Sequence, residues 1–129
     1  MIVDTSALVA ILRQEPEEDR FVELLLADSS PRLSAATLCE ARVVALGYGF
    51  DAELAELLDL IAPAVVPVDE RQAALAFDAF KRFGKGRHPA GLNFGDCFSY
   101  AAARALDEPL LFKGEGFSKT DVTIADATP

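Results

Sequence analysis

Cysteine is scarce in this sequence, and the two that occur, Cys39 and Cys97, are far apart with no C-x-x-C spacing. This usage differs from that of a small secreted domain stapled by disulfides. We therefore expect both to be reduced thiols of a cytoplasmic protein. Because free cysteine is among the most buried residue types, both are predicted to be mostly buried.

Long apolar runs are also missing, since none approaches the roughly 18 residues of a membrane-spanning helix. The first residues lack the basic stretch and cleavage site of a secretory signal, so we expect them to belong to the mature fold. The chain has 129 residues, of which 51% are hydrophobic. It is therefore predicted to form one domain, residues 1–129, with its own core.

Basic residues are few, with 12 Lys and Arg against 21 Asp and Glu and a net charge of −9. This balance argues against a simple nucleic-acid binder, because phosphate neutralisation needs cations. The clustering of the basic residues weakens this argument against nucleic-acid binding. Four of the basic residues fall within seven positions and are followed by His88: Lys81, Arg82, Lys85 and Arg87. The sequence thus predicts a local basic rim on an acidic protein.

Strand and helix patterns alternate along the chain, which is typical of an α/β domain with a parallel sheet. Strands are expected at 1–3, 32–34, 65–68 and 110–112, with a weak last strand at 122–124. Thr5 or Ser6 is expected to cap a helix that runs to about 13. Further helices are expected from Pro16 to about 28 and at 35–46, 51–61, 70–83 and 93–106.

Four acids stand where one expected element gives way to another, or on an otherwise apolar helix: Asp4, Glu40, Asp96 and Glu115. Asp4 ends the first strand, and open α/β sheets build their sites at the carboxyl ends of parallel strands. If the others converge there, their charge requires cations, so a divalent-metal site is the leading hypothesis. Local interpretations stay open: Asp4 as a helix cap, Asp96 in a capping box with Asn93, and Glu115 as a solvated loop residue.

Glu40 is the acid that helix chemistry explains least. Its neighbours three and four positions away are Ala36, Thr37, Val43 and Val44, and none of them can neutralise it. Arg42 is two positions away, and residues at that spacing do not face each other on a helix. Burying an unpaired carboxylate is costly, so Glu40 is expected to find a partner elsewhere, to hold a metal, or to reach solvent at the helix edge.

With these residues in place, the chain resembles a PIN-domain ribonuclease of the VapC toxin type nearly from end to end. The resemblance rests on Glu40 and on three segments: Ile2-Val3-Asp4-Thr5-Ser6-Ala7-Leu8, Asn93-Phe94-Gly95-Asp96-Cys97, and Leu111 to Val122. It implies a single PIN-like domain with a central parallel sheet, the first strand central and helices on both faces.

The resemblance also implies a site. Asp4, Glu40 and Asp96 would bind Mg²⁺ or Mn²⁺, with a fourth acid after the next strand. The family often places an Asp directly before the Phe of that segment, where this chain has Gly116. Glu115 or Asp121 is therefore the candidate for the fourth acid.

The implied function is a metal-dependent endoribonuclease, the toxin of a type II toxin–antitoxin system. Asp4, Glu40, Asp96, Glu115 and Ser6 would form its catalytic set, with the Ser6 hydroxyl on water or phosphate. RNA contacts would come from the basic loop: Lys85, Arg87 and Arg82. Expected partners are RNA, a VapB-type antitoxin and a second copy, whose homodimer surface would use apolar residues of the early helices: Val9, Ile11, Leu12, Phe21 and Leu25.

Two alternatives come from other functional classes. A catalytically impaired PIN-like binding module is suggested by Gly116 in place of an acid. A phosphoacceptor domain resembling response-regulator receivers would also be small, acidic and doubly wound. Such domains carry paired acids after the first strand and an Asp ending the third. This chain offers one acid after its first strand, and Asp69 is followed by a helix pattern rather than a loop.

Overall fold

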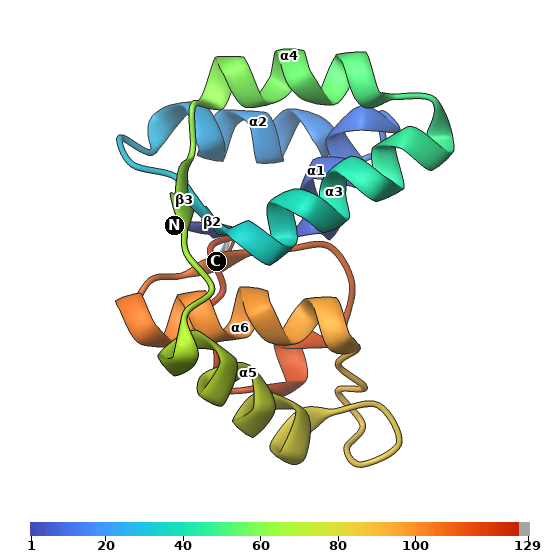
Figure 1. Ribbon diagram of the computed structural model, residues 1–129. Helices are drawn as coiled ribbons and strands as arrows, with labels where there is room; N and C mark the ends of the chain where they lie inside the picture. The colour runs from blue at the N-terminus through green and yellow to red at the C-terminus, as the bar shows by residue number, and fades with distance from the viewer. Residues whose placement is uncertain (127–129) are drawn as a thin grey trace.

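The computed structural model describes residues 1–126, which fold around one parallel four-stranded sheet (Figure 1). Its strands are β1 (Ile2–Val3), β2 (Arg32–Ser34), β3 (Ala64–Val66) and β4 (Leu110–Leu111), in the order β3-β2-β1-β4. Ile2 pairs with Arg32 on one side and with Leu110 on the other. The first strand is therefore interior, as predicted.

Residues 1–126 also contain six α-helices and one 3₁₀ turn, which follows the last strand. They are α1 (Thr5–Leu12), α2 (Glu18–Ala27), α3 (Ala35–Tyr48), α4 (Asp51–Ile61), α5 (Glu70–Phe83), α6 (Phe94–Leu106) and η1 (Phe117–Lys119). None of the helices in residues 1–126 combines the length and apolarity needed to span a bilayer.

The helices lie in two layers, with α1 to α4 above the sheet and α5 and α6 below it in Figure 1. Alternation along the buried strands separates the two cores, since successive side chains of a strand point to opposite faces. Val3 and Leu111 join the core under α1 to α4, whereas Ile2 and Leu110 join the core with α5 and α6. The predicted architecture, with helices on both faces, is confirmed.

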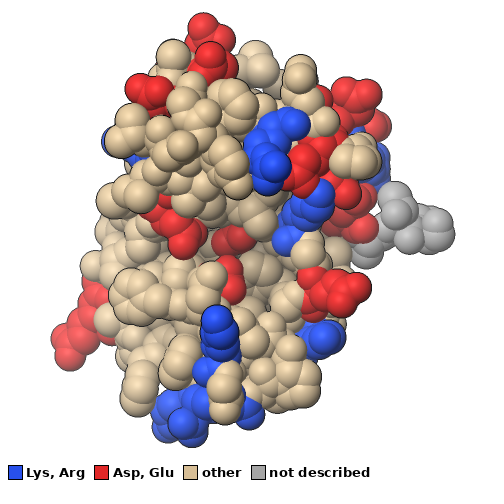
Figure 2. All heavy atoms as spheres, turned by 90° about the vertical axis from the view of Figure 1, so that its right-hand side faces the viewer, with Lys and Arg blue, Asp and Glu red and all other residues tan. Residues whose placement is uncertain are grey.

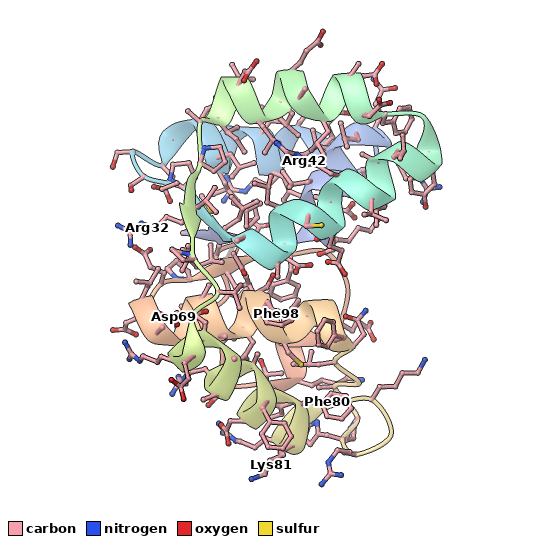
Figure 3. All side chains as sticks on the ribbon, in the orientation of Figure 1. Arg32, Arg42, Asp69, Phe80, Lys81 and Phe98 are labelled. Carbon is pink, nitrogen blue, oxygen red and sulfur yellow. The ribbon has the colours of Figure 1, made fainter. Side chains whose placement is uncertain are left out.

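Cap chemistry sets most helix boundaries. The Ser34 side chain accepts a hydrogen bond from Ala36 N and caps α3, and Asp69, labelled in Figure 3, caps α5 in the same way. Gly49 ends α3 at φ 76°, a left-handed conformation that glycine adopts without steric cost. Of the possible caps of the first helix, the structure uses Asp4 and not Thr5 or Ser6, and Thr5 is the first helical residue.

Three further expectations were wrong in detail. The third strand stops at Val66, because Pro67 has no N–H to continue the ladder. The weak last strand is reduced to one bridge between Leu110 and Ile124. Cys39 is exposed although Cys97 is buried.

The apolar residues expected to offer a dimer surface lie mainly in the core. Ile11, Phe21 and Leu25 are buried in the layer formed by α1 to α4, and Leu12 packs against it. Val9 is half-buried. This set therefore stabilises the domain itself.

Candidate active site

Three of the sequence-predicted acids meet at the carboxyl edge of the sheet. Asp4 follows β1, Glu40 lies on α3, which follows β2, and Asp96 lies in the first turn of α6. The chain leaves β1 towards β2 on one side and returns as β4 on the other, which makes this edge a topological switch point. Figure 2 shows this side of the molecule, with acidic side chains at the middle of the face.

Asp4 is almost completely buried, with 2% of its surface exposed. Its Oδ2 accepts hydrogen bonds from Ser6 N at 3.0 Å and Ser6 Oγ at 2.7 Å. Its Oδ1 accepts one from Ser99 Oγ at 2.5 Å. The capping interpretation of Asp4 is thus confirmed, and Ser99 adds a contact that helix capping does not require.

Glu40 finds a neutral partner on another helix. The Thr5 hydroxyl donates a hydrogen bond of 2.5 Å to its Oε1. Gly95 lies directly against the same carboxylate, and a Cβ built at that position would collide with it. The side chain of Glu40 therefore reaches the start of α6 only because residue 95 has no side chain.

Asp96 forms the predicted capping box with Asn93. Asn93 N donates to Asp96 Oδ2 at 2.9 Å, and Asp96 N donates to Asn93 Oδ1 at 2.8 Å. Burial, together with the negative charges of Asp4 and Glu40, raises the pKa of Asp96 to about 6, although the hydrogen bond from Asn93 opposes the shift. Asp4 and Glu40 are therefore close enough to Asp96 for their charges to oppose its ionisation.

The donor set of this acidic site matches a hard divalent cation. Among the ion pairs within residues 1–126, none neutralises Asp4, Glu40 or Asp96. The hydrogen bonds there engage one oxygen each of Glu40 and Asp96, which leaves the second oxygen of each as a potential ligand. Within residues 1–126, no three acidic side chains lie close enough to one another to bind the same metal ion. Binding would require the carboxylates to draw closer.

The two candidates for a fourth acid lie apart from this cluster. Glu115 is exposed on the loop after β4, and no hydrogen bond or ion pair within residues 1–126 joins its side chain to the three acids. Asp121 is held elsewhere, since it accepts hydrogen bonds from Tyr100 Oη at 2.7 Å and from Arg82 at 3.2 Å. The structure therefore brings together three of the predicted acids and not the fourth.

The three basic residues expected to contact RNA also differ in their surroundings. Arg82 pairs with Asp121 and with Asp78 at 3.5 Å, so its charge is used within the protein. Lys85 and Arg87 are exposed on the loop between α5 and α6. Figure 2 shows Lys and Arg side chains gathered at the lower end of the face that carries the central acids.

Sequence reasoning missed Ser99, Thr37 and the role of Gly95. Thr37 Oγ1 lies 3.1 Å from Ser99 Oγ, and both side chains are buried. These residues are 62 positions apart on α3 and α6, so no local pattern links them. Gly95 carried a weak signal, because glycine in the first turn of a helix is unfavourable unless something must approach its backbone closely.

The model of the PIN domain matches residues 1–122 of the chain. The chain belongs to the PIN-domain family. It is 46% identical over 125 residues to a protein named Ribonuclease VapC from Mycolicibacterium smegmatis, covering 95% of this chain and 97% of that protein.

Two solved structures with low sequence identity share the fold. Mycobacterium tuberculosis VapC20, described as a toxin that cleaves the sarcin–ricin loop, superposes with a TM-score of 0.75 at 16% identity and covers 95% of both chains. A toxin–antitoxin complex from Klebsiella pneumoniae gives a TM-score of 0.72 at 15% identity, covering 95% of this chain and 94% of the other. The predicted resemblance to VapC-type PIN domains is thereby confirmed.

Proposed function

We propose that this PIN domain is an endoribonuclease of the VapC type, the toxin of a type II toxin–antitoxin pair, and that it requires Mg²⁺ or Mn²⁺. The observation that carries the metal dependence is that Asp4 and Glu40 both reach α6 beside Asp96, through Ser99 and Gly95, without a cationic partner in the described chain. The nuclease assignment is supported by the VapC ribonuclease that is 46% identical to this chain over 125 residues.

Asp4 and Asp96 would be the main ligands, and Glu40 would bind the ion or orient its water. A bound ion of this kind lowers the pKa of a coordinated water and stabilises the charge on the leaving oxygen of a phosphodiester. Ser6 acts on Asp4: its hydroxyl accepts a hydrogen bond from Lys113 N at 3.0 Å and donates its proton to Asp4 Oδ2. The Ser6 proton is therefore committed to the carboxylate in this arrangement.

RNA would approach across the basic loop. Lys85 and Arg87 are exposed there, and cations placed beside an acidic centre can hold the phosphate backbone while leaving the centre to the metal. Two backbone hydrogen bonds join the start of the loop to its end. Leu92 N donates to Phe83 O at 2.9 Å, and Lys85 N donates to Leu92 O at 2.8 Å. The two cations are thus presented from a closed loop.

Cleavage of a labelled RNA by the purified protein tests the proposal. We expect activity with Mg²⁺ or Mn²⁺, loss of activity with EDTA, and a loss of at least about 100-fold in Asp4→Asn and Asp96→Asn. Glu115→Gln, which changes a similar acid outside the cluster, serves as the control and is expected to stay active. Wild-type rates in Asp4→Asn would contradict the proposal. Manganese binding without RNA cleavage would instead indicate the impaired binding module.

An antitoxin is the proposed protein partner. A cationic side chain from its C-terminal segment would supply the positive charge that Asp4, Glu40 and Asp96 lack within the described chain. The product of a short reading frame directly upstream should co-purify with this protein and inhibit RNA cleavage at a stoichiometric ratio. Neutralising the basic residues of its C-terminal segment should relieve the inhibition. Cleavage that is unaffected by that product would contradict this partnership.

A homodimer is also proposed, through the aromatic face of α5 and α6. A pocket of about 470 Å³ opens between these helices, lined by Ala73, Ala76, Phe77, Phe80, Phe94, Cys97 and Phe98. Phe94 and Phe77 stand exposed beside it, at 78% and 65%. Figure 3 labels Phe80 and Phe98 on these two helices. A protruding ring and a hollow on one surface are what a twofold contact between identical copies requires.

Light scattering at micromolar concentration tests the dimer. We expect a dimeric mass for the wild type and a monomeric mass for Phe77→Asp. Leu26→Asp is the matched control, because Leu26 is 56% exposed on α2, outside the aromatic face. A monomeric wild type would contradict the proposed dimer.

A further inference from the structure

A pair of buried hydroxyls connects α3 and α6 directly beneath the acidic site. Ser99 is completely buried and Thr37 is 1% exposed, and their oxygens lie 3.1 Å apart. Ser99 Oγ also lies 2.5 Å from Asp4 Oδ1. The same buried stretch of α6 also holds Cys97, Tyr100, Ala101, Ala102 and Ala103. Buried hydroxyls need hydrogen-bond partners, and Ser99 finds its partners in Thr37 and Asp4.

The direction of the protons in this network follows from the chemistry of the groups. An ionised carboxylate only accepts hydrogen bonds, so Ser99 must donate its proton to Asp4. Ser99 then has only lone pairs to offer to Thr37, and Thr37 must be the donor in their contact. On the other side of the carboxylate, the proton runs from Ser6 to Oδ2.

The two oxygens of Asp4 are occupied unequally. Oδ2 accepts two hydrogen bonds from Ser6, and each carboxylate oxygen offers about two acceptor sites, so Oδ2 is filled. Oδ1 accepts a single bond, from Ser99. One acceptor site on Oδ1 is therefore left for a cation, and the bond from Ser99 determines how that site is oriented.

We propose that Ser99, supported by Thr37, is a positioning residue that holds Asp4 so that Oδ1 is its metal-binding oxygen. The inference rests on the proposed metal-dependent function and adds to it two residues from α3 and α6. Thr37 follows the end of β2 and Ser99 follows Asp96 by one helical turn. The pair therefore links the orientation of Asp4 to the helices that carry Glu40 and Asp96.

Manganese binding by the full chain, measured by titration calorimetry in the absence of RNA, tests the proposal. Loss of a residue that orients a metal ligand typically weakens affinity about 10- to 100-fold, and we expect a loss in this range for Ser99→Ala. Thr37→Val removes the supporting hydroxyl at nearly constant volume, and we expect a smaller loss. The double variant should bind no more weakly than Ser99→Ala, because Thr37 acts through Ser99.

Ser34→Ala is the matched control. Ser34 is also a buried serine, 1% exposed, and it caps α3 without contacting any of the three acids. Its loss should lower the melting temperature but leave manganese affinity unchanged. If Ser99→Ala does not fold, Thr37→Val alone still tests the network, because its hydroxyl reaches Asp4 only through Ser99.

Three results would overturn the inference. The first is a manganese affinity of Ser99→Ala within about twofold of the wild type. If only Thr37→Val folds, the same result in that variant counts instead. This result would leave the proposed function intact. The second is an equal loss in Ser34→Ala, which would trace the effect to general destabilisation. The third is a wild-type chain that binds no manganese, which would remove the metal dependence as well.

Discussion

Every carboxylate of the acidic site is held by a neutral hydrogen-bond donor. Ser6 and Ser99 hold Asp4, Thr5 holds Glu40, and the backbone of Asn93 holds Asp96. Neutral donors fix the position of a carboxylate without cancelling its charge. The charges of Asp4 and Glu40 therefore still act on Asp96 in the metal-free protein, and this has measurable consequences for stability.

Asp96 should make the metal-free protein less stable as the pH rises. Its pKa is about 6 in the folded protein, above the ordinary value of 3.8 that it regains on unfolding. Between these values the folded state binds more protons, so stability falls with increasing pH until it levels off above about pH 6. In EDTA at pH 8, Asp96→Asn should raise the free energy of unfolding by about 1 kcal/mol, discounted for partial exposure.

Denaturant unfolding of both proteins at pH 4.5 and pH 8 measures this effect. The gain from Asp96→Asn should be larger at pH 8, and Mn²⁺ should stabilise the wild type more than the variant. A variant that is less stable than the wild type at pH 8 would contradict this prediction. It would show that the ionised Asp96 stabilises the capping box by more than its interaction with Asp4 and Glu40 destabilises the folded state.

Gly95→Ala should impair catalysis without impairing the fold. The added methyl group would collide with the Glu40 carboxylate and displace it from Thr5. Alanine is favoured over glycine in a helix by about 1 kcal/mol, so stability should not fall. We expect RNA cleavage to drop at least about tenfold, as for a misplaced catalytic group. Gly47→Ala on α3 is the control, because a Cβ there meets nothing within 4 Å.

At the scale of elements, α6 contributes to several parts of the protein at once. Its first turn carries Asp96, its second carries Ser99, and its buried Tyr100 reaches Asp121 in the segment after η1. Partial burial raises the pKa of Asp121, but the hydrogen bonds from Tyr100 and Arg82 and the charge of Arg104 outweigh it and lower that pKa. Asp121 therefore acts as an ionised anchor for the C-terminal segment.

Asp121→Ala should accordingly weaken the fold and leave the metal site unchanged. The variant loses the hydrogen bond from Tyr100 and the ion pair with Arg82, and we expect a loss of about 1 kcal/mol in the free energy of unfolding. Manganese affinity and the rate of RNA cleavage at a temperature well below unfolding should equal those of the wild type. Weaker manganese binding would identify Asp121 as the fourth acid after all.

Local patterns predicted the elements well where strong signals bound them. The strand at 32–34 and the helix at 70–83 were predicted with the observed limits, since a turn at Pro31 and caps at Ser34 and Asp69 mark them. Cys39 was predicted wrongly because α3 buries the face of Thr37, Ala41 and Ala45. Its opposite face is exposed and also apolar, so hydrophobic periodicity could not distinguish the two.

The acids of the site were predictable one by one, but their supports were not. Asp4, Glu40 and Asp96 stand at element ends or on an apolar helix, which local patterns reveal. The bond from Ser99 to Asp4 joins residues 95 positions apart, and that from Thr5 to Glu40 joins residues 35 apart. Such contacts follow from how α3 and α6 pack on the sheet, which the sequence of either helix does not specify.

On the scale of the whole molecule, the net charge of −9 opposes RNA binding and makes the exposed cations decisive. Lys85→Ala and Arg87→Ala should each raise the KM for RNA and leave kcat nearly unchanged. If each residue contacts one phosphate, the slope of log affinity against log salt should fall by about 0.7 per variant. Cleavage rates over a range of KCl concentrations measure this slope.

Arg71→Ala is the control for this charge effect, because Arg71 is exposed at the opposite end of α5. It removes the same charge from the molecule as a whole but not from the loop. An equal rise of KM in Arg71→Ala would indicate that overall charge, and not the loop, governs RNA affinity.

Gly116 lies against the backbone of the basic loop, which limits the residues that this position accepts. A Cβ at position 116 would lie 2.9 Å from the carbonyl oxygen of Ala90, a backbone atom that cannot turn aside as a side chain can. Any side chain at position 116, an acid included, would push the loop that bears Lys85 and Arg87. Position 116 and the course of the loop are therefore coupled, and an acid at 116 would be accommodated only if the loop backbone at Ala90 shifted.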